Sequence, residues 1–259
     1  MLPTVVAIGV FGLFHPRALD VEPWGASRVE ISCAGKVIEG SARVRITSDC
    51  VVTGVGGGPV DFVLSVPGRI RRHYQGTLRV TRSSTELTAV VTMALEVAVA
   101  STVAAESPAG AGAAMLEAQA IVTRSYFAAG VRRHGAFDFC DTTHCQFVKD
   151  PPLPESAAGL AAVATAGRVL QYRGLVIAAF YAARCEGLLV PLPASGALEY
   201  PYFAVQCEYC VRHPAKTAAK ANARPHHHGM CQMGAQDLAR QGWNAARILA
   251  QYYPGAELR

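Results

Sequence analysis

The chain has few charged residues and no long apolar run. Charged side chains make up 17% of its 259 residues, against 51% for hydrophobic ones. Such a composition argues against disorder, because the chain can bury enough apolar surface to offset the entropy lost on folding. No apolar run reaches the roughly 20 residues that a transmembrane helix requires. A chain of this length can form one large domain, or a domain and a small module.

A dense run of basic residues is also missing. The formal net charge is +5, and the lysines and arginines are scattered along the chain. An acidic polymer such as a cell-wall glycan is compatible with this charge, whereas nucleic acid is not specifically indicated. The eight cysteines are too few for a disulfide scaffold in a chain of this size. No internal repeat is apparent.

The first part of the chain is predicted to be β structure. Residues 2–14 are apolar enough for the central region of a signal peptide, but no Lys or Arg precedes them and no A-x-A cleavage site follows closely. Residues 5–10 fit a buried opening strand as well. Alternating polar and apolar residues predict further strands at 28–32, 43–47, 78–80 and 87–95. Residues 1–70 are therefore predicted to form a small β module, or strands at the edge of a larger sheet.

A long helix is predicted at about residues 113–131. Apolar residues recur along it at helical spacing in two adjacent stripes. A helix this apolar on most sides is usually central and covered by other elements. Gln119 and Arg124 would then lie near the core and need hydrogen-bonding partners. Arg124 either pairs with a carboxylate only to satisfy itself or helps to form a binding cleft, and spacing alone favours the first.

Two further helices are predicted at 155–166 and 235–252, the second broken around Gly242. Between them, two strands are predicted to form a hairpin whose second strand, at 175–182, carries Tyr181. Strands followed by interspersed helices, without a regular βαβ rhythm, indicate the α+β class. The expected architecture is a central apolar helix packed against mixed strands.

A cluster of metal-type side chains follows the long helix. It consists of His134, Cys140, His144 and Cys145. Thiolates and imidazoles in a tetrahedral array suit zinc. His144 and Cys145 are neighbours, so a loop must bend to direct both at one ion. A structural zinc site is the favoured prediction, and the alternative is a Cys140–Cys145 disulfide or two free thiols beside surface histidines.

Short motifs follow one another in order over residues 70–259. They read YQGTLRV at 74–80, ESP at 106–108, LEAQA at 116–120, RSY at 124–126, DT at 141–142 leading to Gln146, YAARC at 181–185, PYF at 201–203, HHHGMCQMGA at 226–235 and YYPG at 252–255. In this order they resemble the motifs of the SpoIID/LytB family, that is, stage II sporulation protein D and its relatives. The resemblance implies a SpoIID-like core over residues 71–259.

The family resemblance implies a peptidoglycan lytic transglycosylase that cleaves glycan strands between MurNAc and GlcNAc. In that reaction the muramic acid 6-hydroxyl attacks its own anomeric carbon and leaves a 1,6-anhydro end. One carboxylate acting as acid and then base is sufficient, unlike the pair in ordinary glycosidases. Glu106 matches the family's acid/base, and its apolar sequence neighbours suit a raised pKa. The alternative is that Glu106 only caps a helix.

The resemblance also implies the surroundings of the carboxylate. The residues expected to line the glycan-binding cleft are Gln119, Arg124, Gln146, Tyr181 and His226. Some family members carry a Cys₂His₂ zinc site where the His134 cluster stands, beside the cleft and without a role as acid or base. The family further implies an extracytoplasmic location, in the cell wall or periplasm, and a cell-wall amidase as the partner of its LytB branch.

Another group of cysteines is Cys185, Cys207, Cys210 and Cys231. Cys207 and Cys210 form a CxxC motif, which indicates zinc or a redox pair, and no thioredoxin-like βαβ pattern surrounds it. A four-cysteine zinc site and two disulfides both remain open. Cys33 and Cys50 lie on neighbouring β segments, where they could pair or simply be buried.

The sequence departs from the family pattern at two places. Two glycines of the family's Gly-His-Gly-x-Gly motif are replaced around His226, and Cys185 is followed by Glu186 instead of Gly. A loop without these glycines cannot easily adopt glycine-only backbone angles. This altered loop favours a second class, a non-catalytic wall-binding protein that enhances an amidase. The retained Glu106 favours the enzyme. A zinc hydrolase is a remote third class, because no carboxylate base lies at a recognisable spacing from the His134 cluster.

Overall fold

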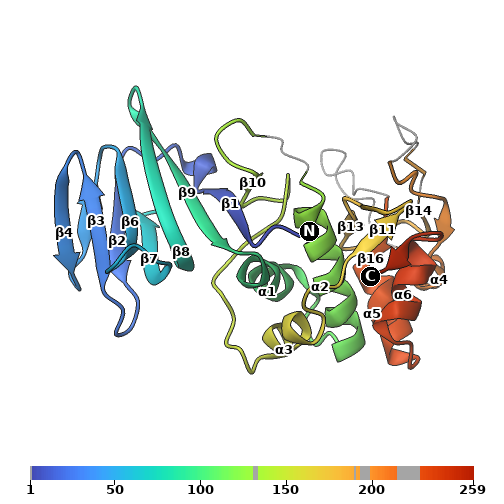
Figure 1. Cartoon of the computed structure of the whole chain (residues 1–259). Helices are drawn as coiled ribbons and strands as arrows, with labels where there is room; N and C mark the ends of the chain where they lie inside the picture. The colour runs from blue at the N-terminus through green and yellow to red at the C-terminus, as the bar shows by residue number, and fades with distance from the viewer. Residues whose placement is uncertain (1, 131–133, 190, 193–198, 215–227) are drawn as a thin grey trace. The chain divides into compact units, whose positions relative to one another are not determined.

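The computed structural model describes residues 2–130, 134–189, 191–192, 199–214 and 228–259 (Figure 1). The chain divides into two compact units. The first contains Pro3–Ala105 and Arg132–Pro152, and the second contains Glu106–Val131 and Leu153–Arg259. The predicted division near residue 70 coincides with the start of strand β8, whereas the compact units divide after Ala105. Helices and mixed strands together confirm the predicted α+β class.

The first unit is built on a mixed sheet with the strand order β10-β1-β9-β8-β6-β3-β4. Its strands are β1 (Val5–Val10), β3 (Val29–Cys33), β4 (Lys36–Gly40), β6 (Cys50–Gly54), β8 (Ile70–Ser83), β9 (Glu86–Ala94) and β10 (Phe139–Cys140). The predicted opening strand is therefore confirmed as β1. Cys33 and Cys50 lie opposite each other on β3 and β6 and form a disulfide.

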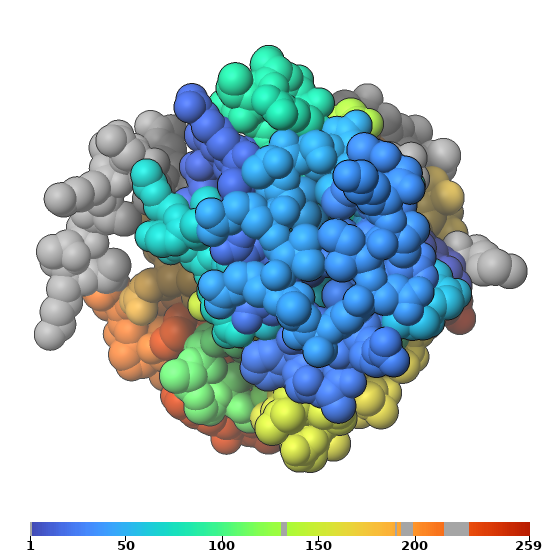
Figure 2. Space-filling model, turned by 90° about the vertical axis from the view of Figure 1, so that its left-hand side faces the viewer, coloured from blue at the N-terminus to red at the C-terminus, as the bar shows by residue number. Residues whose placement is uncertain are grey.

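Strand β8 is long enough to serve two sets of partners. Its first half pairs with β7 (Val60–Val66), and its second half pairs with β9 and β6. Strand β7 in turn pairs with β2 (Leu19–Pro23), which pairs with β5 (Val44–Ile46). Buried side chains such as Tyr74 and Leu78, both 0% exposed, fill the interior. Segments that include β3 and β4 cover the face of this unit seen in Figure 2 (blue).

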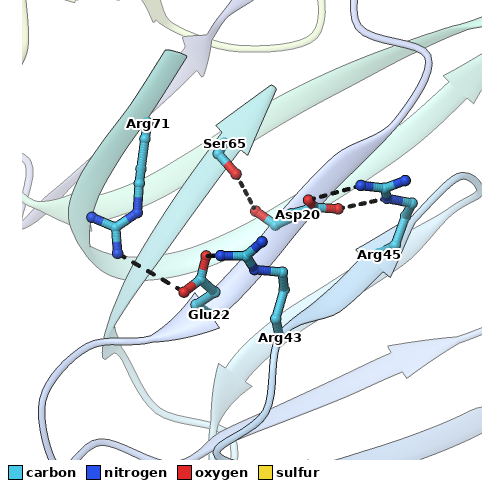
Figure 3. Close-up of polar contacts among 6 residues, drawn as sticks. All are labelled: Asp20, Glu22, Arg43, Arg45, Ser65 and Arg71. Atoms are coloured by element: carbon cyan, nitrogen blue, oxygen red, sulfur yellow. Dashed lines mark hydrogen bonds and ion pairs between the residues drawn. The ribbon is translucent and has the colours of Figure 1, made fainter. Parts of the chain in front are cut away.

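Ion pairs join the strands of the first unit (Figure 3). The carboxylate of Asp20 on β2 accepts two hydrogen bonds from the Arg45 guanidinium on β5, at 2.7 and 3.0 Å. The hydrogen bond from Arg45 lowers the pKa of Asp20 below its ordinary value. Beside them, Glu22 pairs with Arg43 at 2.8 Å and lies 3.9 Å from Arg71. Asp20 and Arg45 are directly opposite each other in the pairing of β2 with β5, so this ion pair supports the register of the two strands.

Helix α1 (Leu95–Glu106) follows β9 without a loop. The sequence pattern predicted strand up to residue 95 and no helix after it. The prediction missed α1 because its run of alanine and valine suits a buried strand and a buried helix equally well. The helix ends at Glu106, two residues before Pro108, because proline disfavours helical geometry in the residue that precedes it.

The second unit is organised around helix α2 (Ala113–Ala128), which is buried on nearly all sides, as its apolar pattern predicted. It packs against α3 (Ala157–Ala164), α5 (Gln232–Arg240) and α6 (Ala245–Tyr252). The Ser156 hydroxyl caps α3 by accepting from the backbone N–H of Gly159 at 3.2 Å. The predicted break near Gly242 separates α5 from α6, where Asn244 caps the new helix. No described helix is both long and apolar enough to cross a bilayer.

Short strands complete the second unit. They are β11 (Leu170–Tyr172), β12 (Leu175–Val176), β13 (Tyr181–Ala182), β14 (Leu188–Leu189), β15 (Val205–Gln206), β16 (Met230–Cys231) and β17 (Glu257–Leu258), and α4 spans Glu208–Arg212. The predicted hairpin exists as β11 and β12, but its second strand ends at Val176. Tyr181 lies instead on β13, which pairs in parallel with Met230 and Cys231 of β16. The prediction erred because this pairing joins segments far apart in the sequence.

Candidate functional site

Glu106 lies within a network of buried amide and hydroxyl side chains. Its backbone carbonyl accepts a hydrogen bond from Nε2 of Gln232 at 3.0 Å, and the same amide donates to Oε1 of Gln119 at 3.1 Å. Nε2 of Gln119 then donates to Oγ1 of Thr123 at 3.3 Å. Gln119 and Gln232 are both buried. The network thus fixes the backbone of Glu106 against α2 and the start of α5.

The phenol of Tyr181 acts directly on the carboxyl group of Glu106. Burial raises the pKa of Tyr181 well above its ordinary value, and the charge of Glu106 and a hydrogen bond to it raise the pKa further. A phenolate beside a carboxylate would be repelled, so Tyr181 stays neutral and its hydroxyl donates a hydrogen bond to the carboxyl group of Glu106. Thr123 also hydrogen bonds to Tyr181. The structure therefore brings together Glu106, Gln119 and Tyr181 of the predicted site.

Arg124 has a different environment. Its side chain is fully buried at 0% exposure. Its guanidinium donates to the backbone carbonyls of Ala162 at 3.1 Å and Arg168 at 3.2 Å. A third donor contact, to Oγ1 of Thr165, measures 3.4 Å. These acceptors lie at the C-terminal end of α3, where the helix leaves carbonyl groups without helical partners and where positive charge is favourable.

Two predicted cleft residues remain, namely Gln146 and His226. Gln146 is buried at 2% exposure and belongs to the first compact unit. His226 lies outside the described residues. Two network members were not singled out from the sequence, namely Thr123 and Gln232. Gln232 stands inside the motif at 226–235, so that motif could have drawn attention to it.

The His134 cluster of the first unit has the spacing of a tetrahedral metal site. The four ligand atoms of His134, Cys140, His144 and Cys145 lie within 4.8 Å of one another. Sγ of Cys145 lies 3.4 Å from Nε2 of His134 and 3.6 Å from Nδ1 of His144, which in turn lies 3.7 Å from Sγ of Cys140. Sulfur and nitrogen ligands of a tetrahedral zinc ion are about 3.6 Å apart, given its usual bond lengths. The donor set fits zinc.

Neighbouring side chains hold the loop that carries this cluster. The buried carboxylate of Asp141 accepts from Nη1 of Arg72 at 2.8 Å and from the backbone N–H of Phe11 at 3.3 Å. Burial raises the pKa of Asp141, and the Arg72 guanidinium opposes that rise. The ring of Phe137 stacks on His134 with centroids 4.6 Å apart and lies against Gly9, where a Cβ would come within 2.5 Å of the ring. These contacts anchor the loop to β1 and β8.

The four other clustered cysteines belong to the second unit. Sγ atoms of Cys185, Cys207, Cys210 and Cys231 lie within 4.8 Å of one another, and all four residues are buried. None of them forms a disulfide. Among the described residues, these cysteines and the His134 cluster are the groups with a metal-type arrangement.

The comparison with known families agrees with the motifs. The model of the SpoIID family, described as stage II sporulation protein, matches residues 83–172. The matched segment runs from the end of β8 to β11 and includes both Glu106 and the His134 cluster. No curated protein matches the chain. The resemblance to the SpoIID family is thus confirmed over these residues, and it supports a role related to the cell wall.

Proposed function

We propose that the protein is a lytic transglycosylase that cleaves peptidoglycan glycan strands between MurNAc and GlcNAc, with Glu106 as its acid/base. The observation that carries this proposal is the environment of Glu106, where a neutral phenol from Tyr181 is directed at a single carboxyl group. The network of Gln119, Thr123 and Gln232 holds the backbone on which that carboxyl group is mounted. One positioned carboxyl group meets the requirement of a reaction in which the substrate supplies its own nucleophile.

Glu106 ends the reaction in the protonation state in which it began. The carboxyl group of Glu106 donates a proton to the glycosidic oxygen, and the bond from that oxygen to the muramyl anomeric carbon breaks. The resulting carboxylate accepts the proton of the muramyl 6-hydroxyl, whose oxygen forms the new bond to the anomeric carbon. No water is consumed. Tyr181 orients the carboxyl group in both steps, and its hydrogen bond stabilises the carboxylate that forms between them.

The proposed role of the His134 cluster is structural. His134, Cys140, His144 and Cys145 would hold a zinc ion with four protein ligands, which leaves no open position for a substrate. The ion would supply rigidity to the loop, and Asp141 and Phe137 already hold that loop against the sheet. An extracytoplasmic location is also part of the proposal. The Cys33–Cys50 disulfide supports it, because disulfides persist mainly in oxidising compartments.

The test is mass spectrometry of the products released from purified glycan strands. Wild-type protein is expected to release 1,6-anhydro-muramyl ends. Glu106→Gln is expected to lower the rate by about 10²-fold or more, since general acid–base catalysis contributes about 10²–10⁴-fold. The matched control is Glu155→Gln, an exposed glutamate of the same unit, which should leave the rate unchanged. Tyr181→Phe should retain part of the activity and change its pH profile.

Other products would overturn parts of this proposal. Reducing muramyl ends without the anhydro ring would mean that water is the nucleophile, and the enzyme would then be a hydrolase. Equal rates for wild type and Glu106→Gln would exclude Glu106 as the acid/base. Wild-type protein that binds strands and stimulates an amidase, but releases no fragments, would replace the lytic function with the wall-binding one.

A further inference from the structure

Four buried cysteines of the second unit converge from separate parts of the chain. Cys185 follows β13, Cys207 and Cys210 stand at the start of α4 and within it, and Cys231 ends β16. The four residues are between 0% and 2% exposed. All four Sγ atoms lie within 4.8 Å of one another, and none is bonded to another. Two disulfides would require each sulfur to be close to only one other sulfur. A tetrahedral ion requires all four sulfurs to be close to one another.

The distance between sulfurs also favours an ion. Sγ of Cys210 lies 3.6 Å from Sγ of Cys231. A disulfide would bring the two atoms to about 2.0 Å. In a tetrahedral zinc site with Zn–S bonds of about 2.3 Å, two sulfurs are about 3.8 Å apart. The observed separation of 3.6 Å is close to this sulfur–sulfur distance.

Donors surround the sulfurs in the way that thiolate ligands need. The backbone N–H of Gly234 donates to Sγ of Cys231 at 3.4 Å, and the hydroxyl of Tyr252 lies 3.6 Å from Sγ of Cys207. The hydrogen bond from Gly234 is the N-terminal cap of α5, where the helix dipole favours negative charge. Four thiolates on a divalent cation carry a net charge of −2, and such donors stabilise that charge inside the protein.

The packing around these sulfurs depends on a residue without a side chain. A Cβ at Gly234 would lie 2.6 Å from Sγ of Cys207 and 2.1 Å from the hydroxyl of Tyr252. Only glycine therefore allows α5 to come this close to the sulfur group. A glycine at position 234 is what a site needs when sulfurs and hydrogen-bond donors pack this closely together.

We propose that Cys185, Cys207, Cys210 and Cys231 form a structural zinc site with four thiolate ligands. Each cysteine releases one proton on binding, and neither the metal nor the sulfurs change oxidation state. With four protein ligands the site has no open position for a substrate. It differs from the Cys₂His₂ group in its ligands, in its compact unit and in its burial.

The elements that this zinc would join are short. Strands β13 and β16 are two residues long each, and α4 is five. Pairs of strands this short are not stable by themselves. Gln232 directly follows Cys231 and bonds to the carbonyl of Glu106, so the metal would also set its position. That consequence for catalysis rests on the proposed function, whereas the metal site itself does not.

The test is the metal content of the full chain, measured on wild type, Cys210→Ser and Cys145→Ser. We expect Cys210→Ser to lose one zinc ion per chain relative to wild type. Cys145→Ser is the matched control, because it removes a ligand of the His134 cluster in the other unit and leaves the four cysteines unchanged. The cobalt-substituted form of Cys145→Ser should show the absorption of tetrahedral cobalt with four thiolates. Equal zinc content in wild type and Cys210→Ser would overturn the proposal. Disulfides among the four cysteines, found after alkylation of the unreduced protein, would do the same.

A second variant covers the case in which Cys210→Ser does not fold. Tyr252→Phe keeps the ring and removes the hydroxyl next to Cys207. Loss of such an outer partner typically weakens metal binding about 10–100-fold, which competition with a chelator would measure. Tyr200→Phe is the control, because its hydroxyl donates to the carbonyl of Pro254 instead. Equal zinc affinity in wild type and Tyr252→Phe would contradict the site. A chain that holds this zinc but cleaves no glycan would leave the site intact and refute the function.

Discussion

Arg124→Met tests whether Arg124 stabilises the fold or contacts a ligand. Methionine keeps much of the apolar stem of the side chain but removes the guanidinium that donates to the carbonyls of Ala162 and Arg168. Both contacts, at 3.1 and 3.2 Å, are within hydrogen-bond range, and the side chain is fully buried. The carbonyl of Ala162 then keeps only the hydroxyl of Thr165, at 3.4 Å, and the partly buried carbonyl of Arg168 loses the donor from Arg124.

The size of the effect follows from these two hydrogen bonds. A buried acceptor left without a donor costs about 1–3 kcal/mol, so the loss of the guanidinium from both carbonyls costs at most about 6 kcal/mol. Part of this loss is offset, because the variant no longer buries a charged group. We expect a net loss of about 3 kcal/mol in the free energy of unfolding of the second unit, which corresponds to a decrease of roughly 10 °C in its melting temperature.

The assay combines calorimetry of the full chain with glycan binding. Arg168→Met is the matched control, because its side chain is exposed at the same end of α3, and it should melt like wild type. Wild-type stability in Arg124→Met together with loss of glycan binding would refute this reasoning. Arg124 would then act as the ligand contact that the family resemblance implies.

Two further predictions concern the first unit. Because Arg45 lowers the pKa of Asp20, the ion pair stabilises the fold above pH 3.8, the ordinary pKa of Asp, and this stability is lost as pH falls through the lower pKa of the folded state. Asp20→Asn should therefore unfold at lower urea concentration than wild type at neutral pH. The difference in urea midpoint should vanish in strong acid. A difference that persists in strong acid would contradict a stabilising role of the Asp20–Arg45 ion pair. Gly76→Ala should lower stability by about 1–3 kcal/mol, as overpacked cores do, because its Cβ would lie 2.3 Å from the carbonyl oxygen of Thr92. Gly12→Ala has open space and serves as its control in thermal unfolding.

Periodicity along the sequence was sufficient for the elements whose pattern is local. Strand β1 and helix α2 each carry a continuous pattern that suits one kind of structure. The break between α5 and α6 follows from Gly242 and the Asn244 cap, both of which act within a few residues. Helix α1 was missed because its alanine and valine residues suit both states, and burial inside the first unit decides between them.

The sequence by itself determined the α+β class, the central apolar helix, the SpoIID motifs and the two sets of metal-type residues. It did not determine which atoms meet. Tyr181 and Met230 pair across 49 residues of chain, and that pairing brings a phenol to Glu106 and Gln232 to Gln119. The sequence likewise does not place the sulfurs of the cysteine group, whereas the fold places Sγ of Cys210 3.6 Å from Sγ of Cys231. Contacts of this kind depend on long-range packing, which no local pattern specifies, and so only the tertiary structure decided them.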